Sequence, residues 1–195
     1  MSKIAIFASG AGSNAAKIIE YFEVKTTMVS VDCIVTNQQE AGVYEVATKH
    51  NVPIFYLSNA AIEVGNEVLT LLKERKIEWI VLAGFLRKIP AIIIQSYPDR
   101  IINLHPSLLP KFGGKGMYGK KVHQQVIESG ETESGISIHL VNEEYDKGEI
   151  ILQQKCMVDT NETVESLSKK VQMLEHKFFP IAIEQAVEFP TSRSY

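Results

Sequence analysis

The chain has 195 residues, of which 45% are hydrophobic and 22% charged, and its formal net charge at pH 7 is −3. This balance is typical of one globular domain with one sizeable core. No long basic run and no apolar run of roughly 20 residues is present, which argues against nucleic-acid and membrane partners, and a leader-like N-terminus is also missing. We therefore expect a cytoplasmic protein.

Short apolar segments alternate with amphipathic ones in the first half of the chain. Strands are predicted over residues 3–8, 29–35, 53–57 and 78–83. Helices are predicted after the turn at residues 9–14, over 42–50, over 61–76 and briefly over 90–95. In the helix over 61–76 the expected core face is Val64, Val68, Leu71 and Leu72.

The segment from Ile101 to Pro110 reads as a short buried strand followed by a loop between two prolines. Asn103 and His105 are two residues apart, so on an extended backbone they point to the same side. An amide donor beside an imidazole that titrates near neutrality suits an acid/base and oxyanion pair. A capped strand end with a hydrogen-bonded polar pair is the equally open alternative.

The second half adds a glycine-rich loop, two helices and two strands. Residues 111–119 contain four glycines, which predicts a mobile loop and a candidate lid. Helices are expected over 120–129 and, with a kink at Pro180, over 162–187, and strands over 135–141 and 149–158. Ser137 and His139 are expected on a wetter face of the first of these strands. Residues 188–195 are predicted to form a frayed tail.

Strands alternating with helices predict an α/β fold with a mainly parallel sheet, as a single domain over residues 1–187. In such sheets ligands bind beyond the carboxyl ends of the strands, where residues 9–14, 84–87 and 103–110 all fall. Cys33 and Cys156 lie far apart inside apolar runs, so we expect buried reduced thiols. No spacing of histidines or cysteines indicates a metal site.

The turn Ser-Gly-Ala-Gly-Ser-Asn at residues 9–14 matches the outline of a dinucleotide fingerprint. Such a site also needs an acid after the second strand, and that place reads Thr-Asn-Gln-Gln at residues 36–39. Gly12, Ser13 and Asn14 therefore favour one phosphate of a nucleotide-like substrate, held at a helix N-terminus. A purely structural turn is the alternative.

Asp146, at the end of an acidic loop, is a candidate partner for His105, because a nearby carboxylate raises an imidazole pKa and orients the ring. A turn aspartate is the simpler alternative. His139 could support this pair or be an ordinary strand residue, and His50, His123 and His176 carry less weight.

Together these segments resemble the glycinamide ribonucleotide formyltransferases of purine biosynthesis. The resemblance covers nearly the whole chain in the family's order, through residues 9–14, 81–87, 102–110, 135–139 with Asp146, and Gln172 with Glu175-His176. It implies a Rossmann-like three-layer formyltransferase fold with a mainly parallel central sheet. The implied activity is transfer of a formyl group from 10-formyltetrahydrofolate, as cosubstrate, to the amine of phosphoribosylglycinamide in de novo purine (IMP) biosynthesis, by a monomer or homodimer without a metal.

The resemblance also implies residue roles. The catalytic set would be Asn103, a protonated His105 and Asp146. The phosphoribosylglycinamide contacts would be Gly12, Ser13, Asn14, Gln172 and Glu175. The folate contacts would be Leu86, Arg87, Lys88, Ile89, Asn142, Glu143, Glu144 and Tyr145.

Two other folate-dependent functions share the central block. A formyltetrahydrofolate hydrolase usually has an additional N-terminal domain, and a methionyl-tRNA formyltransferase has a C-terminal RNA-binding domain; we expect neither here. The chain departs from the resemblance in its longer glycine-rich segment, 112–119, and in the absence of an arginine from residues 58–66, where some members place a cosubstrate contact.

Overall fold

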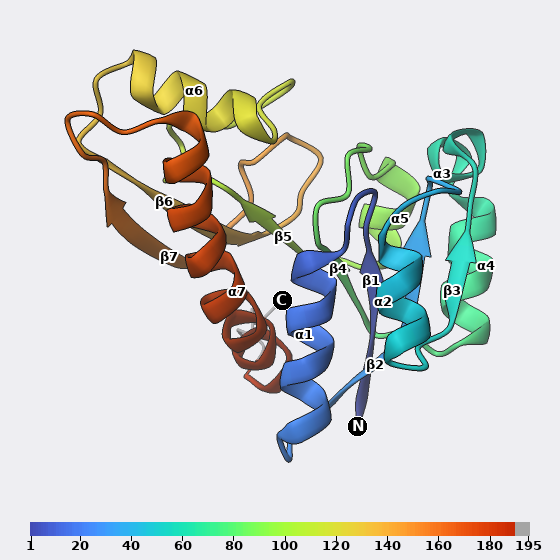
Figure 1. Ribbon diagram of the computed structural model, residues 1–195. Coiled ribbons are helices and arrows are strands. Elements are labelled where there is room, and N and C mark those ends of the chain that lie inside the picture. Colours follow the sequence, from blue (N-terminus) through green and yellow to red (C-terminus); the bar gives the residue numbers. More distant parts are fainter. Residues whose placement is uncertain (190–195) are drawn as a thin grey trace.

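The computed structural model describes residues 1–189 and shows one seven-stranded sheet with helices on both faces (Figure 1). The strands are β1 (Ser2–Phe7), β2 (Val29–Thr36), β3 (Ile54–Tyr56), β4 (Trp79–Leu82), β5 (Ile101–His105), β6 (Glu133–Leu140) and β7 (Ile150–Met157). The helices are α1 (Ser13–Val24), α2 (Val43–Lys49), α3 (Asn59–Val64), α4 (Asn66–Glu74), α5 (Ala91–Ser96), α6 (Lys120–Glu128) and α7 (Val164–Glu188).

The strand order is β3-β2-β1-β4-β5-β6-β7. The first five strands pair in parallel, whereas β6 is antiparallel to both β5 and β7. The predicted α/β fold with a mainly parallel sheet is therefore confirmed. Residues 141–149 join the antiparallel strands β6 and β7, and this connection is shorter than the crossover that a parallel pair needs.

Two separate clusters of buried side chains, one on each face of the sheet, make the fold three-layered. One cluster joins the sheet to α1, α2, α6 and α7, with Ile18 and Phe179 among its largest members. The other joins the sheet to α3, α4 and α5 through Ile62, Leu72 and Ile93. Because both faces of β1 and β4 are covered, Ile4–Phe7 and Trp79–Leu82 are continuous apolar runs with no polar alternation.

The order of the strands reverses between β1 and β4, and this is where loops from distant parts of the chain meet. From β1 the chain moves outward to β2 and β3, then returns to β4 on the other side of β1. The backbone N–H of Ser9, after β1, donates to the carbonyl of Gly84, after β4, at 3.1 Å. The three predicted binding segments thus start at the carboxyl ends of β1, β4 and β5, at the expected edge of the sheet.

The single helix predicted over 61–76 is wrong, because Gly65 divides it into α3 and α4. Gly65 has a φ of 84°, ends α3 and begins α4, and a Cβ there would lie 2.6 Å from Cγ2 of Ile92. Val64, predicted to face the core, is 62% exposed, whereas Val68 and Leu72 are buried as expected. The apolar spacing was compatible with one helix, but the left-handed residue rotates the first turns away from the face of α4.

We expect Gly65→Ala to destabilise the fold by roughly 2–4 kcal/mol, from left-handed strain together with overpacking against Ile92. Urea unfolding of the variant and the wild type measures this. The matched control is Gly130→Ala, since Gly130 also has a positive φ, 68°, but nothing lies within 4 Å of its Cβ position. Equal losses for the two variants would remove the packing part of the argument.

Three smaller expectations need adjustment. Ser137 and His139 do not lie on a wetter face of β6, because they are 0% and 2% exposed. Ser137 bonds to the backbone of Ser107 and Leu109 in the loop after β5, and His139 contacts Asn103. Cys33 is buried as predicted, but Cys156 on β7 is only partly buried, and both thiols are free. Helix α7 continues through Pro180 to Glu188, and the predicted tail lies outside the described residues from 190 onward.

Candidate active site

A cavity of about 690 Å³ opens at the carboxyl edge of the sheet, beside β5. It is lined by residues from the ends of β4 and β5, from loop 114–119, from loop 142–146, and from α1 and α7. Its volume lies within the range of small-molecule sites. The predicted catalytic set, Asn103, His105 and Asp146, lines this one cavity.

Asn103 is positioned by the register between β5 and β6. It pairs with His139, and its Nδ2 lies 3.1 Å from the Nε2 of that histidine. The Nδ1 of His139 lies 2.7 Å from the carbonyl of Leu140, which can only accept a hydrogen bond. His139 therefore carries its hydrogen on Nδ1 and accepts from Asn103, which leaves the second amide N–H of Asn103 for a group in the cavity.

His105 is 4% exposed, and both of its ring nitrogens face protein oxygens. Nε2 lies 2.8 Å from the backbone carbonyl of Phe112, so Nε2 carries a hydrogen. Nδ1 lies 3.6 Å from Oδ2 of Asp146. The predicted proximity of the imidazole and the carboxylate is confirmed, and any lone pair of the neutral ring is on Nδ1, the side of Asp146.

Asp146 is held by the glycine-rich loop and lies near a second histidine. Its Oδ2 accepts the backbone N–H of Gly114 at 2.8 Å, and its Oδ1 lies 3.6 Å from Nε2 of His139. A Cβ at Gly113 would lie 2.5 Å from Cδ2 of Leu109 and 3.2 Å from the Cβ of Asp146, so the loop approaches the site closely at this glycine. Loop 111–119 is thus attached to the site through Asp146.

Burial changes the expected charge of His105. It lowers the pKa of the ring, and the opposing effects of Asp146 and of the Phe112 carbonyl do not restore the ordinary value. Desolvation thus opposes the protonated His105 that the resemblance implies, and its effect on the pKa outweighs that of the nearby carboxylate. Burial also acts against the ionised form of Asp146, but contacts with His139, Gly114 and His105 hold its pKa below the ordinary value.

The glycine turn approaches the other end of the cavity. Helix α1 starts after Gly12, whose φ is 78°, and no side chain caps its N-terminal N–H groups. Gly12 and Ser13 do not line the cavity, whereas Asn14, Gln172 and Glu175 do. Asn14 donates to Glu175 at 2.7 Å, and burial raises the pKa of Glu175 despite this bond. The predicted nucleotide residues of α1 and α7 thus meet.

The two predicted folate segments face each other across the mouth. Most of their members line the cavity: Leu86, Arg87, Lys88, Ile89, Asn142, Glu144 and Tyr145. The ammonium of Lys88 lies 5.2 Å from the centre of the Tyr145 ring, which links the segments. Glu143 lies outside the lining and accepts a hydrogen bond from Gln95 at 3.3 Å.

Two further histidines belong to the site: His139, which the sequence offered as a possible support, and His123, which it gave less weight. His139 supports Asn103, and only the β5–β6 register reveals this. His123 on α6 is 4% exposed, lines the cavity, and has a pKa lowered by burial, with a smaller effect from the neighbouring His105 imidazole. The spacing of Val122, His123 and Val126 on one helix face was a usable signal for its burial.

Within residues 1–189, no cluster of three or more histidine, cysteine or acidic side chains is arranged to hold a metal ion. None of the helices described there is both long and apolar enough to cross a bilayer. Buried Phe85 and Ile89 line the cavity together with polar side chains such as Asn103 and Asn142.

The family model for formyl transferases matches residues 2–183. The chain belongs to the formyl transferase family. A curated family member, phosphoribosylglycinamide formyltransferase of Bacillus subtilis, is 35% identical over 191 residues, which are 95% of this chain and 94% of that protein. The chloroplastic phosphoribosylglycinamide formyltransferase of Arabidopsis thaliana is 42% identical over 182 residues. Both relatives are named as phosphoribosylglycinamide formyltransferases.

Solved structures of the formyl transferase family agree over nearly the full length. The phosphoribosylglycinamide formyltransferase of Bacillus halodurans has a TM-score of 0.87 and 34% identity, covering 96% of both chains. The match to the Arabidopsis protein includes 91% of this chain but only 62% of that relative. The match to the Vigna unguiculata protein includes 61% of that relative. The chain therefore spans about three fifths of these two plant relatives.

Proposed function

We propose that this protein transfers the formyl group of 10-formyltetrahydrofolate to the amine of phosphoribosylglycinamide, a step of purine synthesis. The observation that carries the proposal is the convergence of Asn103, His105 and Asp146 on one cavity that also receives Asn14 and Glu175. Acyl transfer to an amine needs an oxyanion donor and a group that moves a proton, and this set supplies both.

Asn103 would donate its free amide N–H to the formyl oxygen as the amine nitrogen bonds to the formyl carbon and charge builds on that oxygen. Neutral His105 would accept a proton from the attacking nitrogen on Nδ1, beside Asp146. The same imidazolium would return the proton to folate N10 as the bond from the formyl carbon to N10 breaks. Asp146 would stabilise the positive ring in the interval.

The N-terminus of α1 would hold the phosphate through free backbone N–H groups of the turn at Gly12 and Ser13. Asn14, Gln172 and Glu175 would contact the ribose and phosphate. The segments with Leu86, Arg87, Lys88 and Ile89, and with Asn142, Glu144 and Tyr145, would enclose the pterin. Glu143, which does not line the cavity, would contact the folate only outside it.

The direct test follows the loss of 10-formyltetrahydrofolate by the purified protein, with and without phosphoribosylglycinamide. The proposal expects turnover only when the nucleotide amine is present, and formylated nucleotide in equal amount. Glycinamide without the ribose phosphate is the matched control and should react far more slowly. Formyl loss independent of the amine would instead indicate a hydrolase.

Ser9 provides a second test, because it joins the glycine turn to the folate side. Its hydroxyl donates to Asn37 at 2.7 Å and accepts the N–H of Leu86 at 3.0 Å, and Asn37, 5% exposed, donates to Asn59 at 2.8 Å. Asn37 thus has a structural task where a dinucleotide site would carry an acid.

We expect Ser9→Ala to raise KM for the folate by about 5–30-fold, with a smaller change in kcat, as the loss of about 1–2 kcal/mol of hydrogen bonding displaces the Leu86 segment. Steady-state kinetics with varied folate measures this. Ser96→Ala, which removes an exposed hydroxyl on α5, is the control and should leave KM unchanged. A similar rise in KM for the nucleotide, with no rise in KM for the folate, would contradict the link between Ser9 and the Leu86 segment.

A further inference from the structure

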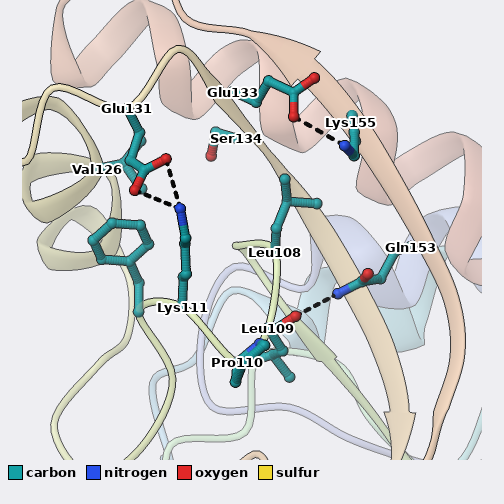
Figure 2. Close-up of a pocket in the computed structure, with 11 residues that line it drawn as sticks. Leu108, Leu109, Pro110, Lys111, Val126, Glu131, Glu133, Ser134, Gln153 and Lys155 are labelled. Atoms are coloured by element: carbon teal, nitrogen blue, oxygen red, sulfur yellow. Dashed lines mark hydrogen bonds and ion pairs between the residues drawn. The ribbon is translucent and has the colours of Figure 1, made fainter.

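A second cavity, of about 300 Å³, lies behind the loop that follows β5 and shares no lining residue with the candidate active site (Figure 2). Loop 108–112 forms one wall, and β6, β7 and α6 form the others. Leu108, Phe112 and Val126 give it an apolar body. Its volume is at the lower end of the range for small-molecule sites.

One buried polar atom in this cavity has no partner. Ser134 is 2% exposed, lines the cavity, and its Oγ makes no hydrogen bond to any described residue. In Figure 2 this oxygen points into the space between Lys111 and Leu108. A buried hydroxyl without a partner is unfavourable, so a bound polar group would complete it.

The charged groups around the cavity are already paired. Lys111 binds Glu131 at 2.8 and 3.0 Å, and Lys155 binds Glu133 at 2.9 Å (Figure 2). Gln153 is also engaged, since its Nε2 donates to the carbonyl of Leu109 at 2.9 Å. Two cations and two anions leave no net charge for an ion to neutralise, and a charged ligand would have to compete with these pairs.

We propose that this cavity binds a small uncharged molecule, an apolar body with one amide or hydroxyl head, through the Ser134 hydroxyl. The ligand would contact the wall that holds His105, because Phe112 lines the cavity and its carbonyl accepts from Nε2 of His105 at 2.8 Å. A ligand bound here would therefore change the surroundings of the His105 imidazole without entering the larger cavity. This binding does not depend on the proposed reaction.

Benzamide is a suitable probe, and benzoate is its charged counterpart of the same shape. Titration of the ¹⁵N-labelled full chain with benzamide should give saturable NMR shifts at Ser134, Val126 and Phe112 and at the His105 imidazole, while Asn14 and Glu175 stay unshifted. Benzoate should bind at least five times more weakly. Ser134→Ala should weaken benzamide binding at least five-fold, and the exposed-site control Ser96→Ala should not.

Thermal unfolding protects the test from misfolding of the variant. Because the hydroxyl lacks a partner, Ser134→Ala should keep or raise the midpoint of unfolding, and a clear drop would overturn the premise. Absence of saturable shifts, tighter binding of benzoate than of benzamide, or unchanged benzamide affinity in Ser134→Ala would each overturn the proposal. Shifts confined to the larger cavity would also overturn it.

Discussion

Replacement of His105 by Asn is expected to lower kcat by about 10²–10⁴-fold, the range of effects for a lost general acid–base group. The ring is buried, its Nε2–H is fixed by the Phe112 carbonyl, and its Nδ1 faces Asp146, so proton uptake is directed to one nitrogen. An asparagine side chain can still donate a hydrogen bond but cannot take a proton at neutral pH. The KM for the nucleotide should change little, since its proposed contacts lie on α1 and α7.

Steady-state rates with both substrates, together with nucleotide binding by calorimetry, separate these effects. The matched control is His50→Asn, the same substitution at a histidine that pairs with Glu23 at 3.1 Å and does not line the cavity. Full activity in His105→Asn, or an equal loss in both variants, would remove His105 from the proton path. Loss of nucleotide affinity would assign the ring a binding role instead.

The architecture was predictable because its signals are local. Continuous apolar runs such as Ile4–Phe7 and Trp79–Leu82 are typical of strands buried on both faces, and glycine turns follow them. The break at Gly65 was not predictable by period alone, because the apolar residues fit one helix and the steric reason, Ile92, comes from another element.

The site was predictable only in its members from strand ends and the acidic loop. Asn103 and His105 are two residues apart on one strand, so they point to the same side. Ligands bind beyond the carboxyl ends of strands in such sheets, which predicted where this pair lies. Their supports depend on contacts across the sheet: His139 reaches Asn103 through the β5–β6 register, and the Phe112 carbonyl reaches His105 through the fold of a glycine-rich loop. The charge of His105 also depends on how deeply the ring is buried, and the sequence, which suggested its pairing with Asp146, does not show this.

Replacement of Asp146 by Asn should lower kcat by about 10²–10³-fold and move the acid limb of the kcat/KM profile to lower pH. Neutral His105 is the form that accepts the proton, so activity falls as pH drops through its pKa. Asp146 raises that pKa against the larger effect of burial, and its loss lowers the pKa further. The rate at the optimum falls because the imidazolium formed in the reaction loses its carboxylate.

The same substitution has a stability consequence with a defined sign. The pKa of Asp146 is depressed in the folded protein, so its charge contributes stability above its unfolded pKa, and this contribution is lost as pH falls through the folded value. Wild type and variant should therefore differ in unfolding free energy at neutral pH, begin to converge as the pH falls below about 4, and meet below the folded pKa of Asp146. Denaturant unfolding at several pH values measures the difference.

Asp99→Asn is the control for the backbone, because Asp99 has a φ of 53°, close to the 55° of Asp146, and does not line the cavity. Asparagine tolerates this left-handed conformation, so neither variant should suffer strain. Asp146→Asn alone should shift the acid limb. If its rate falls while the limb stays in place, the carboxylate acts through Gly114 and the loop it holds, because that bond involves no titration of His105.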